Sequence, residues 1–235
     1  MIVISQPTYF PWIGYFALIE AAENFIFLDD VQFDSRSWQQ RNRILNNDNI
    51  NYLTIPIIKK GLSQQLINNT KIINIDIFEK HLLKIKHAYS KAKYFSEYYP
   101  KIELILSKCK AKENLADVNI YIIKEIAKLL NIKCVFKRSS DLNCTGKKSL
   151  KLINICKKLD NNQYLINEGA LEYIKQDINL FEINKIQLNI IKIDKIAYQQ
   201  LSNNFTEKLS IIDVLLNNGP ETLKLIRKSF KLSSI

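Results

Sequence analysis

The sequence predicts an α/β protein of three layers, in which helices cover both faces of a mostly parallel sheet. Two observations support this fold class. Short β-branched or apolar runs alternate with segments whose apolar residues recur every three or four positions. In addition, the first strand, helix and strand fit within about 30 residues, the length of a right-handed βαβ unit. We therefore expect the first two strands to be parallel neighbours.

The N-terminal elements follow from local patterns. Residues 1–5 form an apolar run that ends at a Gln-Pro pair, which indicates a buried strand stopped by proline. Residues 12–23 have helical periodicity, and residues 25–28 make the second strand. The polar and aromatic residues 31–49 show no clean period, so we predict a long functional loop there, followed by a strand at residues 52–56.

The rest of the chain first becomes helical and then alternates again. Apolar residues recur at helical spacing from about residue 78 to residue 131, which predicts a helical layer or insertion. Beyond it we predict strands at 134–137, 164–166 and 186–193 and helices at 149–159 and 170–176. A terminal helix over 209–216 should stop at Asn-Gly-Pro, and the tail beyond Lys228 should fray.

Length and composition bound the class of protein. The chain has 235 residues, of which 47% are hydrophobic and 24% charged, enough apolar surface for a core. We treat residues 1–235 as a single domain with a helical insertion at about 78–131. Because no apolar run reaches the roughly 20 residues that span a bilayer and the N-terminus lacks a signal-peptide pattern, we expect a cytoplasmic protein.

The charge balance leaves two interpretations open. The chain has 34 basic and 23 acidic residues, giving +11, which can attract phosphates, anionic sugars or nucleic acid. The same excess can be a solvated basic surface. The four cysteines have no Cys-x-x-Cys spacing, so we interpret them as reduced thiols rather than metal ligands.

The turn between the first strand and the first helix is the most informative stretch. Two prolines, a glycine and several aromatic residues crowd a place where open α/β sheets bind ligands. Gly14 would let a phosphate approach the helix N-terminus, and Tyr9, Trp12 and Tyr15 could stack on a sugar or base, beside Gln6 at the strand end. The alternative is that these aromatic residues form the core face of the helix.

A second group of candidates follows the second strand. Asp29 and Asp30 should reach the same sheet edge as Gln6, where a carboxylate could act as general base, bind a hydroxyl or hold a cation, or could cap a turn. His81 could be a lone acid or base, or simply a packed residue. The candidate substrate-binding residues of the following segment are Gln32, Ser37, Trp38, Arg41, Asn42 and Arg43. Their arginines suit forked contacts with phosphate or carboxylate.

Other chemistries lack their signatures in this sequence. His81 and His87 are six positions apart, which is not the spacing of a metal pair on a helix, and we predict no metal and no cofactor. There is no Walker loop, no Rossmann glycine fingerprint and no Gly-x-Ser-x-Gly elbow. Near the C-terminus, Ser210 can cap the last helix and Asp213 lies in its first turn, so capping and function both remain open for them.

These motifs resemble those of the WbqC-like family over nearly the whole chain. The matching residues are Gln6-Pro7, Tyr9, Pro11-Trp12, Gly14-Tyr15-Phe16, Asp29 to Phe33, Ser37-Trp38, Arg41-Asn42-Arg43, Leu53 to Pro56, His81, Tyr89, Leu209-Ser210 and Asp213. Two positions depart mildly from the pattern of the family: Gln40 stands where asparagine is expected, and Glu23 where aspartate is expected. The resemblance implies a bacterial protein of loci for O-antigen (lipopolysaccharide) and other surface polysaccharides. A weaker resemblance to the nucleotidylyltransferase fold implies a nucleotide-binding-like architecture without adenylyl transfer, because Trp12 and Tyr15 replace its two phosphate-binding histidines.

We therefore expect a sugar-tailoring transferase, with acyl or aminoacyl transfer to a nucleotide-linked amino sugar. Its partners would be that sugar nucleotide and an acyl or aminoacyl donor. Two alternatives remain open: a nonenzymatic module that binds a glycan precursor or carrier, and a protein that binds RNA or aminoacyl-tRNA. The sequence leaves the oligomeric state open.

Overall fold

The computed structural model describes residues 1–59, 61 and 64–234, and it confirms the predicted α/β class. Within the described residues the main sheet has six strands in the order β5-β2-β1-β6-β7-β8. Its strands are β1 (Ile2–Ser5), β2 (Asn24–Phe27), β5 (Val135–Arg138), β6 (Gln163–Asn167), β7 (Gln187–Ile193) and β8 (Phe230–Ser234). All neighbours are parallel except β7 and β8.

The strand order changes direction between β1 and β6. Strand β1 continues to β2 through α1 (Ile13–Glu20), so the predicted βαβ unit is confirmed. On the other side, β6 continues to β7 through α7 (Glu168–Ile174), a turn of 3-10 helix (Lys175–Asp177) and α8 (Ile178–Ile183). Because the two crossovers leave in opposite directions, their loops separate at the carboxyl ends of β1 and β6, where open α/β sheets form a crevice.

The two faces of the sheet carry separate cores. Val3 belongs to the larger cluster and Ile2 and Ile4 belong to the smaller one, as the alternation along a strand requires. The larger core packs under α1, α4 (Leu115–Leu129), α9 (Ile211–Asn218) and α10 (Thr222–Lys228). The smaller core packs against α6 (Lys148–Lys158), α7 and α8. Helices thus cover both faces, as predicted.

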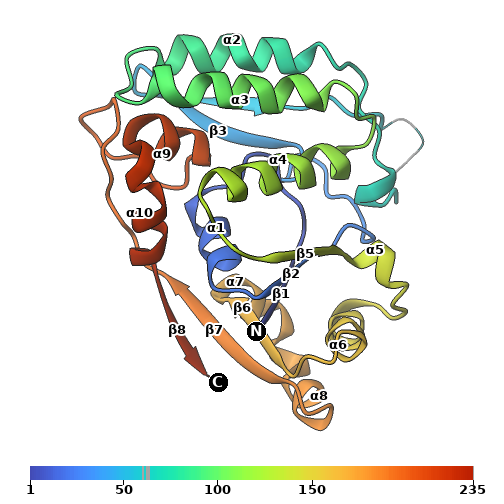
Figure 1. The fold of residues 1–235 in the computed structure, drawn as a ribbon. Helices are drawn as coiled ribbons and strands as arrows, with labels where there is room; N and C mark the ends of the chain where they lie inside the picture. The colour runs from blue at the N-terminus through green and yellow to red at the C-terminus, as the bar shows by residue number, and fades with distance from the viewer. Residues whose placement is uncertain (60, 62–63, 235) are drawn as a thin grey trace.

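The predicted helical region is present as three helices. These are α2 (Ile77–Tyr89), α3 (Phe95–Cys109) and α4, and Figure 1 shows α2 and α3 as the layer farthest from the main sheet. Two short helices flank this region: η1 (Ile67–Asn69) precedes α2, and α5 (Ser139–Leu142) directly follows β5. The assignment of the whole chain to one domain stays a prediction.

The predicted loop over residues 31–49 is partly wrong, because its second half forms a hairpin. Strand β3 (Arg41–Asn46) pairs antiparallel with β4 (Asn49–Thr54), and this second sheet lies between the main sheet and α2. The turn residues Asn47 and Asp48 have φ values of 46° and 62°, which asparagine and aspartate tolerate in tight hairpins. The polar residues at its start concealed this strand, because the side chains of Asn42 and Arg43 have hydrogen-bond partners that lie far away in the sequence.

The C-terminus is a second correction. The helix predicted at 209–216 is α9, and the Asn-Gly-Pro stop is confirmed at Gly219, but the helix is not terminal. A short 3-10 turn (Gly219–Glu221) and α10 follow it, and the tail that we expected to fray forms β8 along the edge of β7. Main-chain pairing to a neighbouring strand orders this polar tail, and such pairing leaves little trace in residue type.

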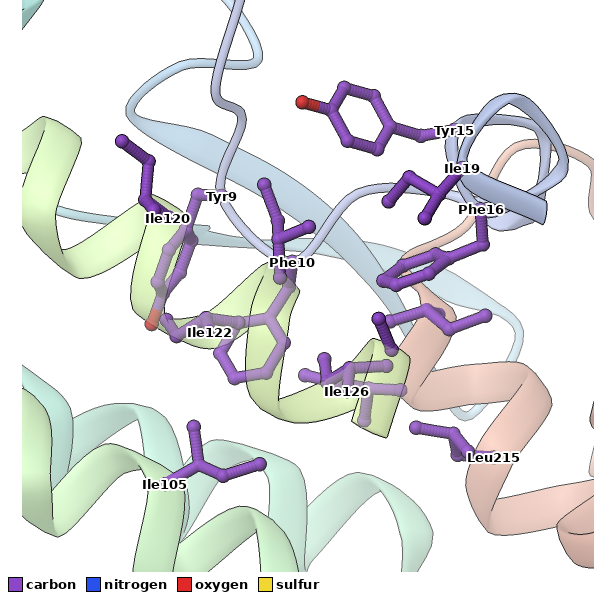
Figure 2. Close-up of a cluster of buried hydrophobic side chains, with 14 of the residues drawn as sticks. Tyr9, Phe10, Tyr15, Phe16, Ile19, Ile105, Ile120, Ile122, Ile126 and Leu215 are labelled. Carbon is purple, nitrogen blue, oxygen red and sulfur yellow. The ribbon is translucent and has the colours of Figure 1, made fainter. Parts of the chain in front are cut away.

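The segment between β1 and α1 crosses the top of the larger core. Tyr9 and Phe10 are fully buried, and Figure 2 shows their side chains directed toward α4, with Ile122 and Ile126 close by. The Asn42 Nδ2 atom donates to the carbonyl oxygens of both residues, at 3.0 Å for Tyr9 and 2.7 Å for Phe10. Phe10 has a φ of 40°, so these two hydrogen bonds hold the chain in a conformation that phenylalanine rarely adopts.

A buried carboxylate fixes the long segment before α9. Ser210 caps α9 as predicted, accepting a hydrogen bond from the Ile212 amide. Asp213 lies in the first turn of α9 and accepts hydrogen bonds from Gln200 Nε2 and from the hydroxyls of Tyr89 and Tyr198, which come from other parts of the chain. Burial raises the pKa of Asp213 from 3.8 to about 6, with these hydrogen bonds opposing the rise.

This shift predicts a pH-dependent effect of Asp213→Asn. Because the folded pKa lies above the unfolded one, the contribution of Asp213 to stability is fully present below pH 3.8 and is lost as the pH rises through about 6. The free energy of unfolding of the wild type, relative to that of the variant, should therefore fall by about 2–3 kcal/mol from pH 4 to pH 7, because one pKa unit corresponds to about 1.4 kcal/mol. Urea unfolding across this range measures it, and a pH-independent difference would contradict it.

Candidate functional site

A cavity of about 620 Å³ opens at the carboxyl ends of β1, β6 and β7. It lies beside the point where the strand order changes direction, and the start of α1, the β3 strand and the segment before α9 close its sides. Its lining residues are Ser5, Thr8, Pro11, Trp12, Gly14, Tyr15, Leu18, Trp38, Asn42, Asn167, Glu168, Gly169, Ile191, Ile193 and Lys208. We call this space the first cavity.

Helix α1 begins in the wall of the first cavity without a side-chain cap. Its N-cap residue is Trp12, which is extended and makes no side-chain cap hydrogen bond, although its carbonyl oxygen accepts from the Tyr15 amide at 3.0 Å, and the first turn carries no acidic residue. The first-turn N–H groups other than that of Tyr15 lack a side-chain cap, and a helix start of this kind favours an anion. The Trp12 indole folds back over Gly14, so close that a Cβ built on Gly14 would lie 2.4 Å from two ring atoms.

Trp38 also lines the first cavity, and Arg43 supports it. The Arg43 guanidinium carbon lies 5.3 Å from the centre of the Trp38 ring. Its Nη2 atom donates to the carbonyl oxygens of Glu207 at 3.2 Å and Lys208 at 2.9 Å, which holds the segment that brings Lys208 to the cavity. Arg41 instead lies over the ring of Tyr52 on the same hairpin.

A second cavity of about 430 Å³ adjoins the first. The two share Ser5, Thr8 and Tyr15, so they meet over the end of β1. The second cavity extends toward the other face of the sheet, against α6 and α7. Its further lining residues are Ile4, Gln6, Leu28, Val31, Lys148, Lys151, Leu152, Tyr164, Ala170 and Tyr173.

The structure places Asp29 in a buried ion pair. Its carboxylate is inaccessible to solvent and accepts hydrogen bonds from Arg138 Nε at 2.7 Å, Ser140 N at 3.0 Å and Ser140 Oγ at 2.9 Å. Arg138 in turn donates to Asp117 on α4 at 2.7 Å. Asp29 therefore joins the ends of β2 and β5 to α4, and its oxygens are already engaged.

Asp30 lies beside the second cavity. Its Oδ2 atom is 2.6 Å from Lys151 Nζ, and its Oδ1 accepts from Ser139 Oγ at 2.5 Å. Because Lys151 lines the second cavity, Asp30 is one side chain away from any ligand there. Of the two aspartates, Asp30 is the one that the structure brings toward a cavity.

His81 is buried together with Tyr9, away from the residues that line either cavity. The Tyr9 hydroxyl and His81 Nδ1 are 2.8 Å apart, and the imidazole also makes a hydrogen bond to the Thr54 backbone. Burial, with a smaller contribution from nearby Lys84, lowers the pKa of His81 from 6.5 to about 3. The imidazole is thus neutral at pH 7 and joins the β1–α1 segment to α2.

Of the remaining predicted residues, only Gln6 lines one of the two cavities. The exposed Gln6 lines the second cavity and accepts a hydrogen bond from Gln39. Ser37 shapes a turn through the Asp34 carbonyl, and Gln32 bridges to Leu66. The predicted residues that the structure brings together around the first cavity are Trp12, Gly14, Tyr15, Trp38 and Asn42.

The sequence analysis missed several residues that line the cavities, chiefly Thr8, Lys148, Lys151, Asn167, Glu168 and Lys208. For Asn167 and Glu168 a signal existed, because they follow a predicted strand and so had to reach the same sheet edge as Gln6 and Asp29. For Lys208 the local sequence gave no indication, because its position depends on the hydrogen bond from Arg43 to its carbonyl oxygen.

Two further classes of feature are not found in the part of the chain that the structure describes. No helix there combines the length and apolar character that crossing a membrane requires. Nor do three or more histidine, cysteine, aspartate or glutamate side chains gather in an arrangement that could hold a metal ion.

Comparison with known proteins agrees with the sequence motifs. A sequence model of the WbqC-like protein family matches residues 6–225. This chain belongs to the WbqC-like protein family. An uncharacterized protein of Mycobacterium tuberculosis is 30% identical to it over 227 residues, covering 96% of this chain and 97% of that protein. No solved structure matches this WbqC-like chain significantly.

The contact between Trp12 and Gly14 predicts that Gly14→Ala displaces the indole. In a Trp38→Phe background, emission from Trp12 alone should shift to longer wavelength, and stability should fall by about 1–3 kcal/mol, as overpacking usually costs. Gly169→Ala, in the wall of the same cavity, is the matched control, because its new Cβ would lie 3.5 Å from the nearest atom. An unchanged Gly14→Ala spectrum would contradict the prediction.

The Asp29 network predicts that Asp29→Asn destabilises this WbqC-like protein by about 2–3 kcal/mol. Removing one partner of a buried ion pair costs about 3–5 kcal/mol, and the 30% exposure of Arg138 reduces that. Urea unfolding measures the loss, with Glu97→Gln, which breaks an exposed pair with Lys101, as a control near zero. A stable Asp29→Asn variant without turnover would instead assign Asp29 a chemical role.

Proposed function

We propose that this protein binds a nucleotide-linked amino sugar at the first cavity and transfers an acyl or aminoacyl group to the amine of the sugar. The observation that carries the proposal is the uncapped start of α1, which opens into a cavity rimmed by two indoles at the change of strand order. A cavity of about 620 Å³ lies within the usual range for small-molecule and cofactor sites.

Each part of the ligand has a complementary part of the site. The phosphates would lie at the first turn of α1, with the Thr8 hydroxyl beside them and the Lys208 ammonium on the rim. Trp12 and Trp38 would stack on the base. Arg43 would act on the ligand indirectly, by supporting Trp38 and the segment that carries Lys208.

The proposed reaction forms one bond and breaks one. The amine of the sugar attacks the carbonyl carbon of the donor, a C–N bond forms, and the bond from that carbon to the leaving oxygen or sulfur of the donor breaks. The proton lost by the amine ends on the leaving group. We assign the proton relay to Asp30, whereas Asp29 and His81 act by positioning the strand ends and the β1–α1 segment.

The family resemblance supports a sugar nucleotide as the ligand class, since it implies a setting of surface-glycan biosynthesis. No cysteine is among the described residues that line either cavity. Direct transfer from donor to acceptor is therefore the mechanism we propose, in preference to a cysteine thioester intermediate.

Ligand binding tests the proposal. UDP or dTDP, free and linked to an amino sugar, should raise the melting temperature. Trp38→Ala should weaken that binding about tenfold or more, because stacking on a base is worth about 1–3 kcal/mol. Tyr52→Ala is the matched control, since Tyr52 is a similarly exposed aromatic (41% against 47%) on the hairpin that follows Trp38, stacks on Arg41 and is not among the residues that line the cavity.

Two outcomes would contradict the proposal. If Trp38→Ala and Tyr52→Ala weaken nucleotide binding equally, the ligand does not lie in the first cavity. No response to any nucleotide would favour a binding module or an RNA-binding protein, and RNA binding would then weaken steeply as salt is raised.

A further inference from the structure

The second cavity has no occupant in the function proposed above, although it shares three lining residues with the first. Both cavities run along helix α7. Its N-terminal residues Glu168 and Gly169 face the first cavity, and Ala170 and Tyr173, one turn apart, face the second. The Asn167 side chain accepts a hydrogen bond from the Ala170 amide at 2.7 Å, which fixes the start of this shared wall.

The residues that line both cavities are polar. They are Ser5, Thr8 and Tyr15, and the Tyr15 hydroxyl donates to the Gln6 carbonyl at 3.0 Å, which holds the ring in place. The Ser5 hydroxyl also hydrogen bonds to Tyr15, and the small hydroxyl side chain of Thr8 lies with it where the two cavities share their lining. This is a place for phosphate oxygens rather than for a base.

The two cavities differ in chemistry. The first has the two indoles and the aliphatic Leu18, Ile191 and Ile193, which suit a flat aromatic group. The second has amino and hydroxyl groups around an apolar floor: Lys148, Lys151, Gln6 and Tyr173 can hydrogen bond to sugar hydroxyls, and Leu28 and Leu152 can contact the apolar face of a sugar ring. The second cavity is also the smaller, and a sugar is smaller than a nucleoside.

We propose that a single nucleotide-linked sugar lies across the end of β1, with its nucleoside in the first cavity, its phosphates over Ser5 and Thr8, and its sugar in the second cavity. This inference rests on the proposed function. It places the sugar beside the Lys151–Asp30 pair, and therefore places the reacting amine near the carboxylate to which we assigned the proton relay.

Binding of matched ligand pairs tests this placement. The probes are UDP with UDP-glucosamine, and dTDP with dTDP-4-amino-4,6-dideoxyglucose, measured by calorimetry on the full chain. Tyr173→Ala and Lys148→Ala change exposed side chains of the second cavity. Each should raise the Kd of the sugar nucleotide about fivefold or more and change the Kd of the free diphosphate less than about twofold.

The controls separate the two ends of the ligand. Trp38→Ala should raise the Kd of both members of a pair by the same factor, because both carry the base. Lys147→Ala, which removes the exposed neighbour of Lys148 that is not among the residues lining the cavity, should change neither. Asp30→Asn should lower kcat for transfer to the sugar while binding of the free diphosphate persists.

The outcomes distinguish the two proposals. If nucleotides bind through Trp38 but the second-cavity variants affect both ligands alike or neither, the placement is wrong and the proposed function survives. If Trp38→Ala is selective for the sugar nucleotide while Tyr173→Ala weakens both, the ligand lies in the opposite direction and the placement is again wrong. If no nucleotide binds, both fail.

Discussion

Two buried carboxamides hold the segment on which the site depends. The chain between β1 and α1 turns over the core with Tyr9 and Phe10 fully buried, so its carbonyl groups cannot be hydrated there. Asn42 donates to the carbonyls of Tyr9 and Phe10, and Asn119 donates to those of Pro7 and Gln39. Together with the backbone hydrogen bonds from Tyr9 to Trp38 and from Ile211 to Pro11, they fix the start of α1 at the edge of the sheet.

Charged side chains at this edge of the sheet hold the surrounding elements in position. Asp29 is engaged by Arg138 and by the serines that open α5, so it joins β2, β5 and α4 and leaves its neighbour Asp30 beside the second cavity. Adjacent carboxylates thus have different surroundings because side chains alternate at the end of a strand. Arg43 and Lys208 differ in a similar way: Arg43 supports the segment that carries Lys208, and Lys208 itself lines the first cavity.

Much of the candidate site was predictable because it depends on sheet topology. A strand that ends at Gln6 and a parallel neighbour that ends at Asp29 must meet at one edge, and Trp12 and Gly14 must lie at the first turn of the connecting helix. The roles of Tyr9 and Arg43 were not predictable. An aromatic residue near a strand end can stack on a ligand or enter the core, and the choice depends on His81 and Asn42, which come from distant elements.

The sequence by itself determined the α/β class, the parallel β1–β2 pair and the helical region, because these depend on periodicity and on short connections. Tertiary structure alone decided the β3–β4 hairpin, the pairing of β8 and the second cavity with Lys148 and Lys151. The reason is physical: polar residues reveal little about whether a hydrogen bond goes to water or to a partner more than a hundred positions away, as Arg43 and Lys208 illustrate.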